Sequence, residues 1–222
     1  MAGPVLGLDA CRRGWVGVVV EDGRFVEAVF ATSAGALIPG FAVVGVDIPI
    51  GTTVSGQRAC DVAARSFVGA RRSSVFNALP TSVLSAGSYA EAAAACVALT
   101  GKGLSQQSWG LVAKTREVAA LRDAWPVYEV HPEVSFRALH GEPLPWPKTT
   151  WNGLALRQRL LASAGVVVPD SLGLAGTLAA PNDVLDAAAV AWTATRIASG
   201  RASTLPDPPE LDAEGRPLAI WY

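Results

Sequence analysis

The sequence predicts an α/β protein with a mixed five-stranded sheet flanked by helices. The apolar runs Val5–Leu8 and Val43–Val46 are each followed at once by an aspartate, Asp9 and Asp47. Runs this short and apolar are typical of strands buried on both faces of a sheet. The strands just after Asp9 are joined by short turns, which indicates antiparallel pairing, whereas longer helical segments separate the later strands. These observations together predict a sheet of mixed direction.

The strands around Asp9 are expected to form an antiparallel meander. Trp15–Val20 follows a turn-like connection, and Phe25–Phe30 follows Asp22-Gly23, a strong hairpin signal. We expect the Asp9 strand to be central in the sheet. Its neighbours should be the antiparallel second strand on one side and the Asp47 strand on the other.

The later elements are predicted from helical periodicity, caps and turn residues. Helices are expected over residues 55–68, 90–99, 104–123, 133–140, 150–164 and 181–199, and a strand over residues 127–131. In the helix over 150–164, Arg157 and Arg159 are expected nearer to solvent. The proline-rich segment Leu205–Glu210 is predicted to be an exposed linker. The apolar tail Pro217–Tyr222 is expected to pack back on the body. Residues 1–222 are therefore expected to form one domain with a helical insertion around 85–124 and a packed C-terminal tail.

Composition narrows the class of protein. The 222 residues are 50% hydrophobic with a formal net charge of −1, so there is no general electrostatic attraction to nucleic acid, and any such binding must come from a local patch. No apolar run approaches the roughly 20 residues that span a bilayer, and a signal-peptide pattern is absent. Cys11, Cys60 and Cys96 have no paired spacing, which argues against a disulfide framework or a zinc site. We expect a cytoplasmic protein that does not enter membranes.

Acidic residues at the ends or starts of buried elements form the candidate site. They are Asp9, Asp47, Glu129, Glu133, Asp183 and Asp186. Such a cluster would suffer like-charge repulsion unless cations were bound. Oxygen ligands suit Mg²⁺ or Mn²⁺ rather than zinc. Two such ions about 3.5–4 Å apart can activate a water for in-line attack on a phosphodiester. The sequence therefore predicts a metal site made by all six acids.

The individual residues also have simpler interpretations. Asp183 could complement a helix dipole and Glu133 could be an ordinary first-turn acid, whereas Asp186, one turn further, shares the helix face of Asp183. His131 lies on the same strand face as Glu129, so it is a candidate ligand or proton shuttle, and a structural histidine is equally compatible. The predicted catalytic residues are Asp9, Asp47, Glu129, His131 and Asp183.

A local basic patch precedes the insertion. Residues 55–80 contain four arginines, Arg58, Arg65, Arg71 and Arg72, against one acid, Asp61. Such a set is often only a solvated face, but a loop with two adjacent arginines can hold phosphates. We interpret these four arginines as candidate substrate-binding residues.

The chain also resembles a known family. The resemblance covers nearly the whole chain and rests on motifs that are specific together: Gly7-Leu8-Asp9 with Gly14-Trp15, Val46-Asp47-Ile48-Pro49-Ile50-Gly51, Arg58-Ala59-Cys60-Asp61 with Arg65, Glu129-Val130-His131-Pro132-Glu133, Lys148-Thr149, Gly153, Arg157, Asp183-Val184-Leu185-Asp186, and Gly215-Arg216-Pro217 with Ile220-Trp221-Tyr222. These residues resemble the domain of unknown function family four-two-nine, which is described as predicted nucleases of the ribonuclease-H-like fold. That family's last helix often opens with two consecutive acids, and here the first is Asn182.

The resemblance implies a metal-dependent nuclease with Mg²⁺ or Mn²⁺ as cofactor and DNA or RNA as partner. Its nuclease label follows from fold, which is a weak basis for function. A second hypothesis is a nucleotide-binding or ATPase-like protein, because actin-like kinases share this core. A third is a non-catalytic nucleic-acid-binding relic that uses Arg71 and Arg72.

Overall fold

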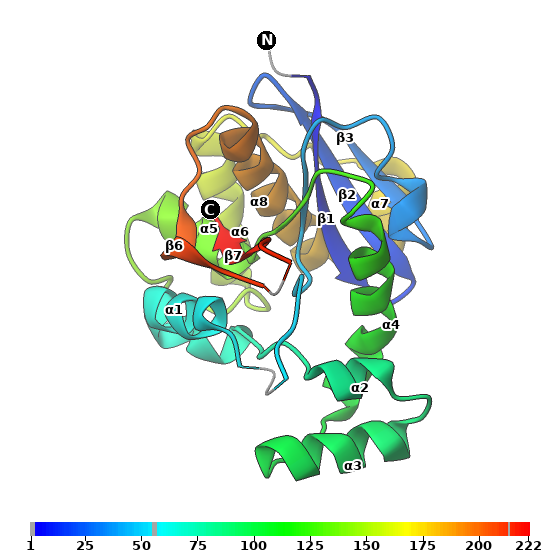
Figure 1. Ribbon diagram of the computed structural model, residues 1–222. Helices are drawn as coiled ribbons and strands as arrows, with labels where there is room; N and C mark the ends of the chain where they lie inside the picture. Colours follow the sequence, from blue (N-terminus) through cyan, green and yellow to red (C-terminus); the bar gives the residue numbers. More distant parts are fainter. Residues whose placement is uncertain (1–2, 55–56, 213) are drawn as a thin grey trace.

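The central strand of the sheet is β1 (Val5–Cys11), which carries Asp9. The computed structural model describes residues 3–54, 57–212 and 214–222 (Figure 1). The sheet has the order β3-β2-β1-β4-β5, in which β2 (Gly14–Glu21) and β3 (Arg24–Ala31) are antiparallel to their neighbours. The short strands β4 (Val44–Val46) and β5 (Val127–Glu129) extend the sheet in parallel from β1. This order confirms the predicted neighbours of the Asp9 strand and agrees with a ribonuclease-H-like fold.

Helices flank the sheet (Figure 1). Their bounds are α1 Ala59–Val68, α2 Thr81–Ser85, α3 Tyr89–Thr100, α4 Gln106–Leu121, α5 Pro132–His140, α6 Trp151–Ser163, α7 Gly173–Leu178 and α8 Pro181–Ala198, with 3-10 turns η1 Ala34–Ala36 and η2 Gly69–Ser74. The predicted start of the first helix at Ser55 lies outside the described residues. Alternate side chains of β1 enter different cores: Val5 packs with α8, and Leu6 and Leu8 pack with residues of η1 and α4.

Helix α8 lies unusually close to the sheet because glycines face it. A Cβ on Gly7 of β1 would stand 2.1 Å from the Ala191 nitrogen and 2.3 Å from the Ala187 oxygen of α8. The helix presents small buried side chains to this contact, and Ala187 and Ala191 are both completely buried. Strand and helix backbones therefore touch, which fixes the start of α8 relative to the end of β1.

Helices α2, α3 and α4 occupy the chain between β4 and β5 and are called the helical insertion below. Helices α2 and α3 extend away from the sheet, and α4 returns along it (Figure 1). Side-chain hydroxyls cap two of these helices: Ser88 accepts from the Glu91 nitrogen and Ser105 from the Ser108 nitrogen. The predicted N-cap at Ser105 is confirmed.

The C-terminal region corrects one prediction and confirms another. Leu205–Glu210 is not a free linker, because it lies within β6 (Thr204–Leu211), which pairs with β7 (Pro217–Trp221). The pairing is interrupted between Leu205 and Glu210, where prolines lack the N–H that a ladder needs. The tail packs on the body as predicted, since Ile220 is buried against α1 and α5.

A further correction concerns Arg157, which is completely buried rather than near solvent. The inward face of α6 includes Gly153, Arg157 and Leu161, which are four residues apart. Burial of the guanidinium is possible because the Glu133 carboxylate accepts a hydrogen bond from it at 2.6 Å. Across the described ranges, no helix has both the length and the hydropathy needed to cross a bilayer.

Candidate functional site

The two strand-end aspartates meet at the carboxyl edge of β1 and β4. Asp9 lies near the end of β1, and Asp47 directly follows β4, where its N–H donates to the Leu8 carbonyl at 3.0 Å. The carboxylates of Asp9 and Asp47 interact electrostatically, since the charge of Asp47 contributes, after burial, to the raised pKa of Asp9. Asp9 shares the face of β1 that carries Val5 and Gly7, and this face is covered by α8.

Helix α8 brings two more aspartates to the same place. Asp183 is in its first turn and Asp186 is three residues further, completely buried. Asn182, at the position where the family often has an acid, donates a hydrogen bond to the Asp183 carboxylate at 2.7 Å. The amide thus orients the neighbouring ligand candidate instead of adding a charge.

Lys148 is the cation of this cluster, and the sequence analysis did not include it among the site residues. Its Nζ donates to the Asp186 carboxylate, and it also attracts Asp9 and Asp47. Although burial alone would lower the pKa of Lys148, Asp186, Asp47 and Asp9 together raise it. One lysine thus stands among four aspartates, which leaves the cluster with excess negative charge if all four are ionised.

The aspartates respond to this crowding and burial by holding protons more tightly. Burial, followed by the charges of Asp47 and Asp186, raises the pKa of Asp9 well above its ordinary value. Burial also raises the pKa of Asp47 and of Asp183. The pKa of Asp186 is raised by burial to about 7, although Lys148 opposes the shift. Because burial is the main cause of these shifts, the site favours neutralisation of its carboxylates, by protons or by a bound cation.

The cluster is suited to a hard divalent cation. Its donors are carboxylate oxygens, which Mg²⁺ and Mn²⁺ prefer. The Oδ1 atom of Asp186 is buried and has no hydrogen-bond partner among the described residues, and the same is true of the Glu133 Oε2 atom. A bound cation would remove the repulsion and give such oxygens a partner. In their chemistry these oxygens therefore fit the predicted metal, although among the described residues three possible ligand atoms within 4.8 Å of one another are found at Cys60, Asp61 and Glu129 instead.

A cavity of about 210 Å³ opens at this cluster. Its wall includes Asp9, Asp47, Asp183 and Lys148 together with Glu129, His131 and Glu133. The structure thus gathers six of the seven predicted acidic and histidine site residues around one cavity, and Asp186 lies behind the wall, bonded to Lys148.

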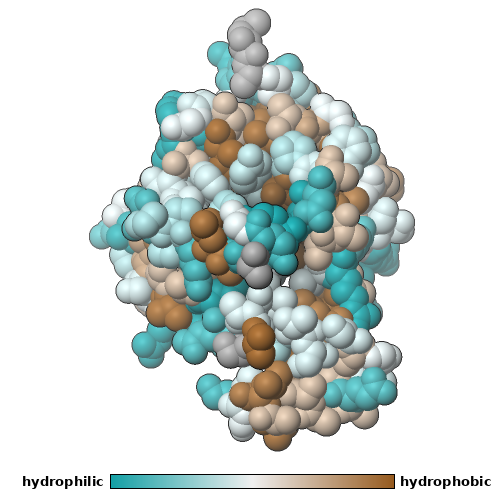
Figure 2. Space-filling view, viewed as in Figure 1, coloured by the Kyte–Doolittle hydropathy of each residue, from teal (hydrophilic) through white to brown (hydrophobic). Residues whose placement is uncertain are grey.

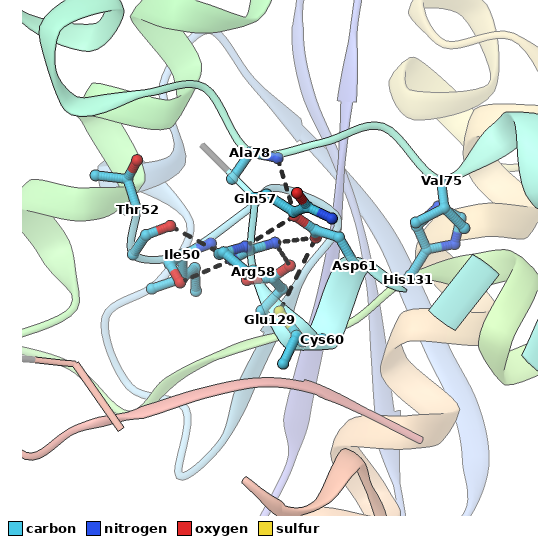
Figure 3. A network of polar contacts seen from close by, with 12 residues as sticks. Ile50, Thr52, Gln57, Arg58, Cys60, Asp61, Val75, Ala78, Glu129 and His131 are labelled. Atoms are coloured by element: carbon cyan, nitrogen blue, oxygen red, sulfur yellow. Dashed lines mark hydrogen bonds and ion pairs between the residues drawn. The ribbon is translucent and has the colours of Figure 1, made fainter. Parts of the chain in front are cut away.

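Glu129 belongs to a second, separate network (Figure 3). The buried Arg58 guanidinium lies between two carboxylates and donates to Asp61 at 2.6 Å and to both Glu129 oxygens at 2.7 Å. Glu129 also accepts from the Ile50 nitrogen at 2.6 Å. Arg58 is 1% exposed and bonded to two carboxylates, so its predicted role in phosphate binding gains no support from its surroundings and stays a prediction. The excess of arginines over acids in residues 55–80 could not show whether an individual arginine is solvated or buried between two carboxylates.

This network could hold a metal ion by the spacing of its atoms alone. The Cys60 sulfur and carboxylate oxygens of Asp61 and Glu129 lie within 4.8 Å of one another. Arg58 already supplies the positive charge at this place, however. Burial also raises the pKa of the Cys60 thiol to about 12, which disfavours the thiolate that a metal requires. We therefore favour the aspartate cluster as the metal site.

His131 and Glu133 both have structural contacts. The His131 Nδ1 atom accepts from the Glu133 nitrogen at 3.2 Å as the N-cap of α5, and its Nε2 atom lies 3.2 Å from the Ser74 carbonyl. The pairing of Glu133 with Arg157 leaves only one carboxylate oxygen without a partner. Their predicted catalytic and ligand roles remain predictions.

The other three arginines occupy different positions. Arg65 donates to the Val75 carbonyl at 2.8 Å and 3.0 Å, so it braces the loop after η2. Arg71 and Arg72 lie in the last turn of η2, next to Ser74 on the cavity wall, and Arg72 is exposed. The sequence prediction of substrate binding remains open for Arg71 and Arg72.

The fold and this site together define an α/β protein whose five-stranded sheet is consistent with a ribonuclease-H-like fold and whose carboxyl edge carries an acidic cavity. The family described as "Protein of unknown function (DUF429)" matches residues 7–211, and the chain belongs to it. No curated protein and no solved structure matches the chain.

Proposed function

We propose that this protein is a metal-dependent phosphodiesterase that acts on nucleic acid. The observation that supports the proposal most is the convergence of three aspartates, from β1, the end of β4 and α8, on one cavity, with Lys148 in its wall bonded to a fourth, Asp186. A divalent cation bound there would supply an activated water and stabilise charge that develops on a phosphodiester.

The chain's own residues would prepare this reaction. Asp9 and Asp47 hold the cation at the end of the central strands, and Asp183 approaches from α8. Lys148, which is partly exposed in the cavity wall, can donate to a non-bridging phosphate oxygen. Arg71 and Arg72, in the last turn of η2 close in sequence to Ser74 of the cavity wall, would hold neighbouring phosphates at the rim.

The proposal is tested by hydrolysis of bis(p-nitrophenyl) phosphate and of single-stranded DNA and RNA, with Mn²⁺, Mg²⁺ or EDTA. We expect metal-dependent cleavage by the wild type. Asp183→Asn should lower it by at least the roughly 10–100-fold that loss of a supporting group costs a metal site. Asp170→Asn, which changes an exposed acid outside the cavity, serves as the matched control. Absence of metal-dependent cleavage with every substrate would contradict the proposal, and release of phosphate from ATP would favour the nucleotide-hydrolysing alternative.

A further inference from the structure

The cavity has two walls of different chemistry. The sheet edge and α8 provide the carboxylates and Lys148. The opposite wall comes from the helical insertion and the loop before it, which contribute apolar and uncharged polar side chains: Phe76, Asn77, Leu79, Leu84, Gln107 and Leu111. In Figure 2, apolar residues lie on one side of the lobe formed by α2 and α3 and near its junction with the main body, and further apolar patches lie on the main body.

Phe76 is the aromatic side chain of this wall, and it is 48% exposed. The half-exposed ring leaves apolar area open in the cavity, and a ligand that covers this area gains free energy by removing it from water. A nucleobase is a suitable cover, since every base can stack on an aromatic ring.

The loop that presents Phe76 is held on both sides. Before it, the Val75 carbonyl accepts both hydrogen bonds of Arg65. After it, the Ala78 nitrogen donates to Asp61 at 3.1 Å, within the buried Arg58 network (Figure 3). Two of the arginines predicted to bind phosphate thus hold in place the loop that carries the aromatic ring. A loop whose backbone is fixed in advance loses little entropy on binding.

The size and charge of the cavity limit what can enter. Its volume of about 210 Å³ is below the roughly 300–1,000 Å³ typical of sites for drug-sized ligands. Among the described residues that line it, the Lys and Arg side chains are Arg58, which is committed to two carboxylates, and Lys148. A strand with several phosphates inside the cavity would meet more negative than positive charge. One phosphodiester at the metal is accommodated, and a second is not.

We propose that the cavity binds one nucleotide unit, with its phosphodiester at the aspartates and its base against Phe76. The substrate is then the end of a strand or a small nucleotide diester, and positions inside a long strand are not cleaved. This inference rests on the proposed phosphodiesterase function and adds the substrate class to it.

The test compares substrates and one variant with Mn²⁺ present. The substrates are a linear single strand and a covalently closed circle of the same sequence, each as DNA and as RNA, and two small diesters, thymidine 5′-(p-nitrophenyl phosphate) and bis(p-nitrophenyl) phosphate. We expect cleavage of the linear strand and of the thymidine ester, and an intact circle. In Phe76→Ala, the preference in kcat/KM for the thymidine ester over the baseless ester should fall roughly 10-fold or more, as when a base loses its stacking partner.

Leu174→Ala truncates an exposed apolar side chain in α7, outside this cavity, and should keep the wild-type preference. Cleavage of circle and linear strand at equal rates, or an unchanged preference in Phe76→Ala, would overturn the inference while leaving the phosphodiesterase function in place. If the wild type cleaves no diester, the proposed function fails. Calorimetric titration with thymidine 5′-monophosphate then tests whether the cavity binds a nucleotide. Binding weakened by Phe76→Ala would support the nucleotide site, and absence of binding to the wild type would overturn it.

Discussion

At the scale of single residues, Lys148 supplies positive charge that stabilises the aspartate cluster when no metal is bound. Its ammonium group contacts Asp186 and lies near Asp9 and Asp47, the position that a cation would favour. The sequence could not indicate this role, because Lys148 stands in a proline-rich loop with no period that would place its side chain. The strand-end aspartates were predictable, since a buried strand that ends in an acid points that acid to a known edge of the sheet.

Replacing Lys148 with Met should destabilise the metal-free protein near neutral pH. The aspartates would then lose the lysine that is bonded to Asp186, and breaking a buried pair by removing one partner costs about 3–5 kcal/mol, reduced here because the Lys148 side chain is 36% exposed. Thermal melts in EDTA measure this loss. Mn²⁺ should recover more stability in Lys148→Met than in the wild type, because the ion replaces the missing charge. Lys102→Met, an exposed control, should change neither value.

At the scale of elements, the close contact of α8 with β1 aligns the acids. Gly7 permits this contact, and α8 carries Asp183 and Asp186 to the end of the strand that carries Asp9. Periodicity predicted both elements and their acids. Periodicity could not predict β6, because a proline-rich segment is typical of a linker. Residues at the two ends of β6 become part of a strand only by pairing with β7. It also placed Arg157 in solvent, since burial of a guanidinium depends on a partner, Glu133, that is distant in sequence.

Gly7→Ala should separate α8 from the sheet. Its Cβ would stand within 2.3 Å of two backbone atoms of α8, which cannot move without the helix. We expect a loss of about 3 kcal/mol or more in the free energy of unfolding, as for severe overpacking, and weaker Mn²⁺ binding because Asp183 and Asp186 shift. Denaturant unfolding and calorimetry measure both. Gly110→Ala, in α4 where a Cβ meets nothing within 4 Å, should instead stabilise by up to about 1 kcal/mol. Equal effects of the two substitutions would contradict this account.

At the scale of the whole molecule, the acidic cluster gives the metal-free protein a characteristic pH dependence. In the folded protein the pKa of Asp9 is raised well above the ordinary 3.8, by burial first and then by Asp47 and Asp186. The unfolded chain therefore releases the Asp9 proton at lower pH than the folded protein does. The contribution of protonated Asp9 to stability is complete below pH 3.8 and is lost as pH rises toward the raised folded value.

Asp9→Asn removes this dependence, because the amide stays neutral at every pH. In EDTA, the variant should match the wild type at about pH 4 and become more stable than the wild type as pH rises toward about 8. Denaturant unfolding of both proteins over this range gives the difference directly. A variant that is less stable than the wild type throughout the range would show that Asp9 makes structural hydrogen bonds instead.

The most direct test of a metal site at the aspartate cluster is a set of thermal melts at neutral pH, each with EDTA and with Mn²⁺. Wild type, Asp9→Asn and Cys60→Ala are compared, because Cys60 belongs to the alternative group of possible ligands. We predict that Mn²⁺ raises the melting temperature of the wild type and of Cys60→Ala by similar amounts, and that Asp9→Asn loses most of this rise while melting no lower than the wild type in EDTA. No Mn²⁺ shift in the wild type, together with a lower melting temperature of Asp9→Asn in EDTA, would contradict the metal site and make Asp9 a structural residue.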